Sequence, residues 1–342
     1  MCTFANKKLL YRQSEHSCHS EIYFAIYKCI VSANIDLYSD KCRIKPMTVA
    51  QVTAQKSYLN RPKAIGIKVR KPSFNPKAIR RHFFANSPVM SHLLTALSST
   101  FPVGEQFFVH SVRNVRDKIT DEKLQAQIAA FIGQEAMHSK AHAEFNDAWR
   151  RDDYNLDSFQ AWLACRDAFI KSVHPKLQLA VTCAFEHFTA LLGGYILRNP
   201  QVLSTLDDDA IKLWVWHAIE EIEHRAVAFD VYQAIYKDDR TRRAVMRNVT
   251  TGFASLTFYS ATRLFMQDWR KSVPKVIQNV HGIYMISKML ISLIPEYLSY
   301  YKADFHPDEI DYSKIVTYWK EKLADEYGME SFQEETHPVL YS

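Results

Sequence analysis

Two stretches of this 342-residue chain carry ionisable side chains inside an apolar helical stripe. In residues 124–149 and 214–231, the positions spaced alternately four and three apart form the seam that a helix turns toward a bundle core. Burying Glu or His without a partner is costly, so each seam must face a compensating group. The residues that interrupt the two apolar seams are Glu135, His138, His142, His217, Glu221 and His224.

The remainder of the chain also has the pattern of long helices. The composition, with 47% hydrophobic residues and only 8 Gly and 12 Pro, is typical of a helical globular protein. Capping residues and prolines delimit four helices, at Ser98 to Pro102, Thr120, His174-Pro175 and Thr205. Further helices are predicted at 240–268, 274–301 and 313–327. We expect the first two of these to pack on the bundle rather than to lie on a membrane surface.

Two other predicted helices each carry one lone carboxylate in their seam. Glu105 lies in Gly-Glu-Gln-Phe-Phe, and Glu186 lies in Ala-Phe-Glu-His-Phe. The chain order is therefore Glu, Glu-x-x-His, Glu, Glu-x-x-His, which is the ligand order of dinuclear carboxylate bundles. A Glu and a His three residues apart share a helix face, so one helix can give a metal both donors. We predict an all-α, ferritin-like four-helix bundle with additional C-terminal helices, holding two metal ions.

Three further residues are assigned roles from their positions relative to this ligand pattern. His217 lies four residues before Glu221, and we expect its imidazole to be a seventh ligand, reaching the metal that His224 binds. His142 is either a further ligand, an outer donor or a core histidine. Glu220 is interpreted as an acid that orients a ligand histidine, with an exposed surface residue as the alternative.

The donor types also favour particular metals. Mixed carboxylate and imidazole ligation suits iron or manganese better than zinc, and the extra histidine favours a redox metal. We therefore expect two iron ions, with manganese or zinc as alternatives. Such a site can activate O2 toward a small-molecule substrate, with electrons from a donor. The alternatives are a hydrolase that uses metal-activated water and a non-catalytic iron-binding bundle.

The ligand pattern resembles known families. The order Glu105, Glu135, His138, Glu186, His217, Glu221, His224 resembles that of the arylamine N-oxygenases related to p-aminobenzoate N-oxygenase, which implies O2-dependent oxidation at two irons. Over a longer span, from Phe83 to His306, the sequence resembles the bacterial family of predicted transition-metal-dependent hydrolases. The segments that carry this resemblance are Gln134-Glu-Ala-Met-His, Glu220-Glu-Ile-Glu-His-Arg and Asp304-Phe-His-Pro. That second resemblance implies metal binding and leaves the reaction open.

Domain organisation and partners follow from composition. We expect residues 1–46 to be an extension, disordered or upstream of the natural start at Met47, then a basic arm over 47–82 and the metal-binding helical domain over 83–342. The six Cys form no CxxC pair and no secretory signal is evident, which favours the cytoplasm. The net charge of +6 is scattered, so no nucleic-acid partner is expected. A homodimer and peripheral membrane contact stay open.

Overall fold

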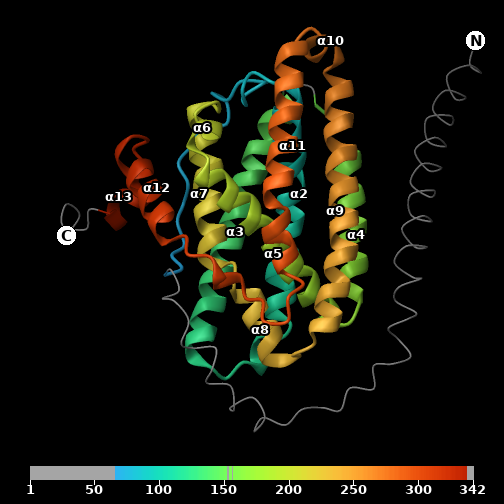
Figure 1. Cartoon of the computed structure of the whole chain (residues 1–342), viewed down its shortest axis with the longest axis vertical. Helices are drawn as coiled ribbons and strands as arrows, with labels where there is room; N and C mark the ends of the chain where they lie inside the picture. The colour runs from blue at the N-terminus through green and yellow to red at the C-terminus, as the bar shows by residue number, and fades with distance from the viewer. Residues whose placement is uncertain (1–65, 152–153, 156, 337–342) are drawn as a thin grey trace, which may run out of the picture. The chain divides into compact units, whose positions relative to one another are not determined.

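The computed structural model describes residues 66–151, 154–155 and 157–336, and within these ranges the chain is helical and has no strand (Figure 1). The prediction of an all-α fold is confirmed. These residues belong to one compact unit, residues 56–342, whereas the predicted extension over 1–46 lies outside the described ranges. The helices are α2 (Pro88–Arg113), α3 (Glu122–Arg151), α4 (Asp157–Ser172), α5 (Pro175–Arg198), α6 (Pro200–Leu203), α7 (Asp208–His224), α8 (Val227–Ile235), α9 (Asp239–Gln267), α10 (Trp269–Ser272), α11 (Val276–Ser299), α12 (Ser313–Asp325) and α13 (Glu330–Thr336).

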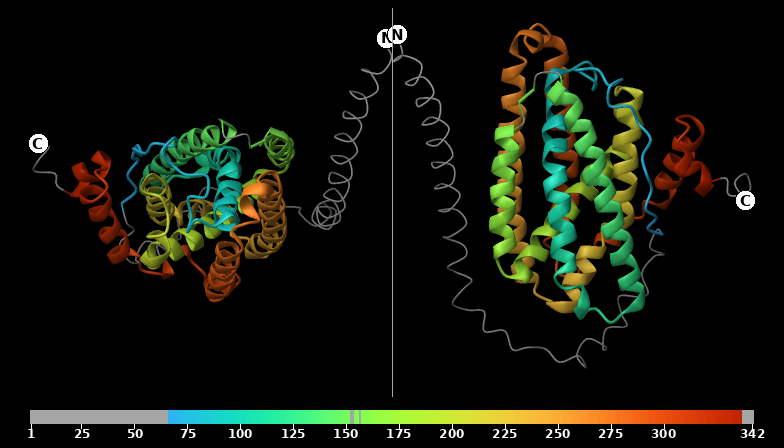
Figure 2. Two further views of the ribbon diagram at one scale, coloured as in Figure 1. Left: turned by 90° about the horizontal axis from the view of Figure 1, so that it is seen from above. Right: turned by 180° about the vertical axis from the view of Figure 1, so that it is seen from behind.

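Four helices make up the centre of the molecule. Helix α2 packs against α3 and α5, and α7 packs against α5 and α3, so each contacts two of the others (Figure 2). Helices α5 and α7 approach closely where Gly193 meets Ala218, because a Cβ at Gly193 would lie 3.2 Å from the Ala218 carbonyl oxygen. The inner faces of these four helices therefore meet along a buried core.

Helix α2 begins earlier than the sequence indicates. Its N-cap is Ser87, whose hydroxyl accepts from the Met90 N–H, and Pro102 lies inside the helix. The prediction of a helix start near Pro102 is wrong, because the fold satisfies the carbonyl that the proline leaves without an N–H donor. The side-chain amide of Asn146 on α3 donates to the Ser98 carbonyl at 2.9 Å, replacing the missing helical bond.

The described part of the basic arm is bound to the bundle rather than free. It runs without regular structure from residue 66 beside α7 (Figure 2). Arg70 is 2% exposed and lies against two acidic side chains of α7. The predicted boundary between arm and helical domain therefore separates segments that pack together.

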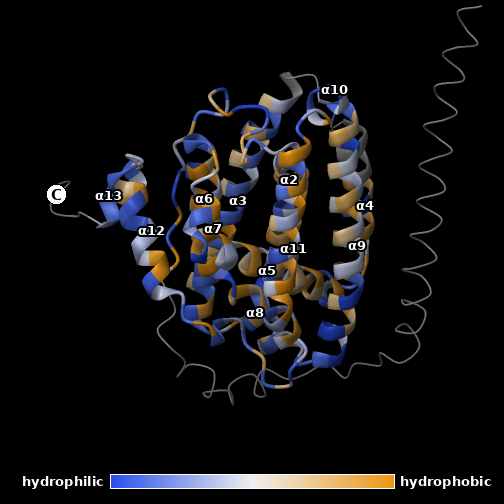
Figure 3. Ribbon diagram, turned by 45° about the horizontal axis from the view of Figure 1, so that its top comes forward, coloured by the Kyte–Doolittle hydropathy of each residue, from blue (hydrophilic) through white to orange (hydrophobic). Residues whose placement is uncertain are grey.

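Helices α9 and α11 each pack on the bundle with one side and leave the other side exposed. Both pack against α2 and α5, as expected for added bundle helices. Their outer sides nevertheless expose large apolar residues, and hydrophobic colouring runs along α11 (Figure 3). The expectation of ordinary packing helices thus holds for their inner sides alone. Among the described helices, only α5 is long and apolar enough to cross a membrane, a property shared by core helices, and most of its apolar window is buried.

Candidate metal centre

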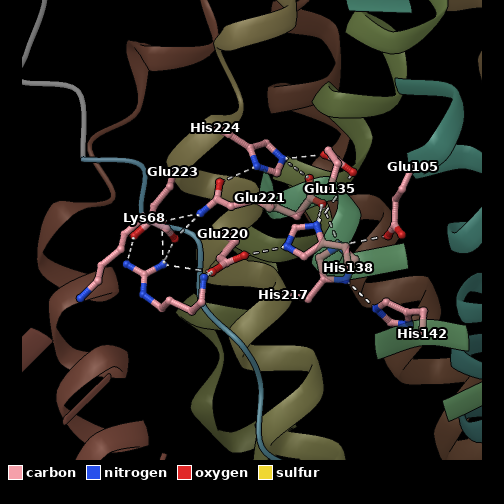
Figure 4. Close-up of polar contacts among 12 residues, drawn as sticks. Lys68, Glu105, Glu135, His138, His142, His217, Glu220, Glu221, Glu223 and His224 are labelled. Atoms are coloured by element: carbon pink, nitrogen blue, oxygen red, sulfur yellow. Dashed lines mark hydrogen bonds and ion pairs between the residues drawn. The ribbon is translucent and has the colours of Figure 1, made fainter. Parts of the chain in front are cut away.

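The structure brings the seven predicted ligands into one buried cluster. Figure 4 labels these residues apart from Glu186. Helices α2 and α5 each contribute one carboxylate, from Glu105 and Glu186. Helix α3 contributes a Glu and a His three residues apart, and α7 contributes a second such pair together with His217. All seven residues are at most 4% exposed, so the helical spacing has placed them on core-facing sides.

One end of the cluster is centred on His224. Its Nε2 atom lies 3.1 Å from Glu135 Oε1, 3.3 Å from Glu186 Oε2 and 3.4 Å from Glu221 Oε2. The donor atoms of Glu135, Glu221 and His224 all fall within 4.8 Å of one another, the spacing of ligands around one metal ion. This end can therefore hold one ion between three carboxylates and one imidazole.

The other end is formed by Glu105, His138 and His217, whose donor atoms also lie within 4.8 Å of one another. His138 Nδ1 lies 3.5 Å from Glu221 Oε1, and His217 Nε2 lies 2.7 Å from the same oxygen and 4.0 Å from Glu105 Oε1. The rings of His138 and His217 stack with centroids 4.2 Å apart. This end can hold a second ion with two imidazoles.

The position of His217 corrects one expectation. The sequence predicts that it joins the metal bound by His224, but it lies with His138 at the opposite end of the cluster. His217 precedes Glu221 by one helical turn, whereas His224 follows it by nearly one turn, so the two imidazoles lie on opposite sides of that carboxylate along α7. The Glu-x-x-His of α3 supplies the histidine that His217 meets.

Two carboxylates connect the two ends. Glu221 turns Oε1 toward His138 and His217, and Oε2 toward His224. Glu135 places Oε1 at 3.1 Å from His224 and Oε2 at 4.0 Å from His138. These two residues can bridge a pair of ions, while Glu105 and Glu186 each face one end.

The inward-facing atoms of this cluster lack hydrogen-bond partners. Both carboxylate oxygens of Glu105, Glu135 and Glu186 are buried without one, as are His138 Nδ1 and His224 Nε2. Buried polar atoms are almost always paired, because leaving one unpaired forfeits its interaction with water. A group of unpaired oxygens and imidazole nitrogens converging on one volume fits bound cations.

The pKa shifts of the four carboxylates also fit a site that holds cations. Burial raises the pKa of Glu105 well above its ordinary value, raises that of Glu135, and raises that of Glu186 to about 8. Burial also opposes ionisation of Glu221, but the surrounding histidines hold its pKa well below the ordinary value. Ionising all four carboxylates would place four negative charges in the core. Two divalent cations would balance them, with the histidines neutral.

Two of the three histidines of the cluster are oriented by matching partners on the opposite helix. His138 Nε2 donates to Glu220 Oε2 at 3.1 Å, so Nδ1 is left to face the cluster. His224 Nδ1 donates to Gln134 Oε1 at 2.9 Å, so Nε2 is left to face the cluster. Glu220 and Gln134 each directly precede a bridging Glu, which is the signal that could have identified Gln134 from the sequence.

The structure contains an ion-pair network beside the metal-ligand cluster that the sequence analysis did not predict. Arg70 bonds Glu220 Oε1 at 3.2 Å and both carboxylate oxygens of Glu223 at 2.8 Å. Glu223 also accepts from Gln134, and Lys320 of α12 pairs with it at 2.7 Å. Arg70 therefore places a positive charge against the carboxylate that accepts from His138. No local pattern marks Arg70, because its partners lie about 150 residues further along the chain.

His142 lies behind His217 rather than at the carboxylates. Its Nε2 shares a hydrogen bond of 2.6 Å with His217 Nδ1, and its Nδ1 bonds the Ser98 hydroxyl at 2.9 Å. Ser98 in turn donates to Asn146. Of the roles considered for His142, the geometry fits that of an outer partner that orients a ligand imidazole.

Two apolar cavities reach the cluster. The first lies between α2, α5, α7 and α11, where Phe101, Leu97 and Met289 surround a space bordered by His217 and Glu221. The second lies between α2, α4, α5 and α9, and Glu105 and Glu221 border it. The cluster is thus the charged end of the first, mostly apolar cavity, whereas Arg166 and Asp167 also line the second.

Comparison with known proteins assigns the chain to a family. A family model described as predicted metal-dependent hydrolase matches residues 68–311. This range makes up most of the chain and includes every residue of the cluster. No curated protein and no solved structure matches the chain significantly. The family match and the clustered His and Glu donors together support a metal-dependent enzyme. The chain belongs to the family of predicted metal-dependent hydrolases.

Proposed function

We propose that this protein is a hydrolase with a dinuclear metal centre, formed by Glu105, Glu135, His138, Glu186, His217, Glu221 and His224. The observation that carries the proposal is the convergence of unpaired, buried donor atoms on one volume, with Glu135 and Glu221 facing both of its ends. The description of the family supports hydrolysis over the oxidation expected from the ligand pattern.

The chain's own residues would bind the ions, position the substrate and handle protons. Two bound divalent ions would polarise a carbonyl or phosphoryl oxygen and lower the pKa of a water. Gln134 and Glu220 hold the ligand imidazoles in the tautomers that the ions need. Glu105 borders the second cavity, so a carboxylate oxygen that it does not give to an ion would be placed to accept the proton of an attacking water. The apolar cavity walls select a substrate with an apolar body.

The test is metal-dependent turnover without O2. The protein is stripped of metal and reloaded with Fe(II), Mn(II) or Zn(II). It is then incubated anaerobically with p-nitrophenyl esters and phosphate esters of different chain length. Hydrolysis that requires a divalent ion and is lost in Glu221→Ala is expected. Absence of hydrolysis across the panel in a protein holding two ions per chain would overturn the proposal.

A second function, O2-dependent oxidation, is favoured by one observation. His217 gives the centre a third imidazole beside Glu105 and His138, in keeping with the resemblance to the arylamine N-oxygenases. Additional nitrogen donors change the redox potential of an ion more than the charge of its site. Rapid mixing of the Fe(II)-loaded protein with O2 decides this: a transient visible absorption band supports oxidation, and slow featureless autoxidation contradicts it.

A further inference from the structure

The outer side of α11 is an exposed apolar stripe. Ile277, Val280, Ile283, Tyr284, Ile291 and Ile294 are each at least 50% exposed, and they recur at the spacing of one helix face. The opposite side is fixed to the bundle, because Leu293 is buried and Gly282 lies directly against Ser87. The rigid bundle thus presents this stripe outward, and no other part of the described chain covers it.

The stripe continues into the turn that precedes α11. Trp269 of α10 is 50% exposed and Val273 is 36% exposed. We call these two residues and the six of α11 the outer apolar face. From Val276 to Leu298 the helix is about 33 Å long, at about 1.5 Å per residue. Contiguous apolar surface on this scale marks a binding site for a partner or a membrane.

The charges around the outer apolar face are of one sign. Residues 269–295 contain no acidic residue, and their exposed charges are Arg270, Lys271 and Lys288. Lys275 is engaged with His82. The acids at either end of this segment are engaged, since Asp268 is buried against Arg81 and Glu296 pairs with Arg198. An apolar helix face bordered only by cations is complementary to anionic lipid headgroups. A second copy of the same face would bring like charges together.

The helix that carries this face is also a wall of the first cavity. Met285 and Met289 turn inward from α11 and line the cavity that ends at His217 and Glu221. The remaining wall is apolar, including Leu94, Leu97 and Leu192. A molecule dissolved in lipid against α11 would therefore lie close to an apolar cavity that ends at the metal ligands.

We infer that the outer apolar face docks on an anionic lipid membrane with α11 lying along its surface, and that the cavity behind α11 takes a membrane-dissolved, long-chain substrate. Docking stands independently of the chemistry. The substrate class rests on the proposed function, because it assumes that the cavity serves the metal centre. The charged Lys288 near the middle of α11 fits a helix lying in the interface rather than one crossing the bilayer.

Docking is tested by sedimenting the full, metal-loaded chain with vesicles. Phosphatidylcholine vesicles containing phosphatidylglycerol should bind the protein at least tenfold better than phosphatidylcholine alone, and salt should weaken the binding. Ile283→Glu/Ile291→Glu should reduce binding at least tenfold. Thr317→Glu/Tyr318→Glu, a matched change at exposed positions of α12, should leave it unchanged. Circular dichroism checks that both variants are folded.

Two outcomes overturn docking. One is a folded wild-type protein that binds neither kind of vesicle. The other is a wild-type dimer in sedimentation velocity that Ile283→Glu/Ile291→Glu dissociates, without vesicle binding, which would assign the face to a second copy of the chain. Neither outcome depends on turnover, so failure of the proposed function would leave this test intact.

The substrate class is tested by binding of a pyrene-labelled long-chain alcohol, which carries no metal-binding carboxylate. The metal-loaded protein should bind it, and Met289→Trp, which fills the cavity, should weaken binding at least tenfold. Met266→Trp, at a 57% exposed position, is the control and should not change binding. Absence of binding, or equal binding by Met289→Trp and wild type, overturns this part of the inference.

Discussion

The described part of the chain contains two buried clusters of His and acid residues with closely spaced donor atoms, and within that part only one has the features of a metal centre. Each end of the ligand cluster of the bundle places three donor atoms within 4.8 Å of one another, and so does the trio His82, His92 and Asp268. In the trio, Asp268 accepts from His82 at 2.7 Å, from Ser272 at 3.0 Å and from Arg81 at 3.1 Å. In the bundle, three of the four carboxylates have no hydrogen-bond partner.

The difference lies in where the positive charge comes from. The chain supplies Arg81 to Asp268, and it supplies Lys275, whose Nζ lies 2.8 Å from His82 Nδ1. It supplies no Lys or Arg to the inward oxygens of the bundle cluster among the described residues. Residue types and their proximity therefore do not define a metal site. What distinguishes the bundle cluster is a group of buried carboxylates that no Lys or Arg of the described chain neutralises.

The largest effect should follow removal of a bridging carboxylate. We expect Glu221→Ala or Glu135→Ala to abolish binding of at least one of two metal ions, because each carboxylate faces both ends of the cluster. Metal analysis of the purified variants measures this. His92→Gln, which changes the other cluster, should keep two ions per chain. Two ions per chain in both bridging variants would refute the assignment.

Arg70 lies in a region where the chain itself supplies the positive charge beside buried carboxylates. Substituting Arg70 tests how much that charge stabilises the fold. Arg70→Met should lower the free energy of unfolding by about 3–5 kcal/mol, because it removes the guanidinium from the buried Glu220 and Glu223. Among side-chain partners, Glu220 then keeps only His138, and Glu223 keeps Gln134 and Lys320. Urea unfolding of the metal-free protein gives the value. Arg80→Met, at an exposed ion pair, should change it by less than about 1 kcal/mol. A similar small change for Arg70→Met would mean that the network contributes little.

The cluster around His92 should make stability depend on pH. Burial lowers the pKa of His92 to about 4 from its ordinary 6.5, although Asp268 opposes the shift and His82 and Arg81 add to it. The unfolded chain therefore binds a proton between pH 6.5 and 4 that the folded protein does not, so stability falls as pH falls through that window. The loss should approach about 3 kcal/mol.

His92→Gln is the variant that isolates this contribution. It removes the titrating group, so its stability should fall less than that of the wild type between pH 6.5 and 4. Chemical unfolding of metal-free protein at several pH values measures both slopes. Parallel slopes would show that His92 contributes no proton linkage.

The smallest expected change in metal content is that of His217→Ala. Glu105, Glu221 and His138 remain at that end of the cluster, so two ions per chain should be retained. The rate of turnover should change at least tenfold, because one neutral donor has been lost from an ion that faces the first cavity. Unchanged turnover with both ions bound would make His217 a packing residue.

The helical spacing of the sequence is sufficient to predict which of the acidic and histidine side chains face the core. Alternating steps of three and four residues assign Glu135, His138, Glu221 and His224 to core-facing seams, and this depends only on the period of the α-helix. The position of Glu220 beside a ligand predicts its orienting role, and it does bond His138. The predicted start of α2 is wrong, because the residue that satisfies the carbonyl freed by Pro102 lies on another helix.

What the sequence determined by itself is local: the all-α class, the helix faces and the order of the carboxylates and histidines. The tertiary structure decided which side chains meet across helices. It placed His217 with His138 and aligned Gln134 with His224. It also buried Arg70 beside Glu223 and left the outer side of α11 exposed. Periodicity specifies the direction of a side chain from its own helix axis, whereas partners, exposure and charge balance depend on how separate helices pack.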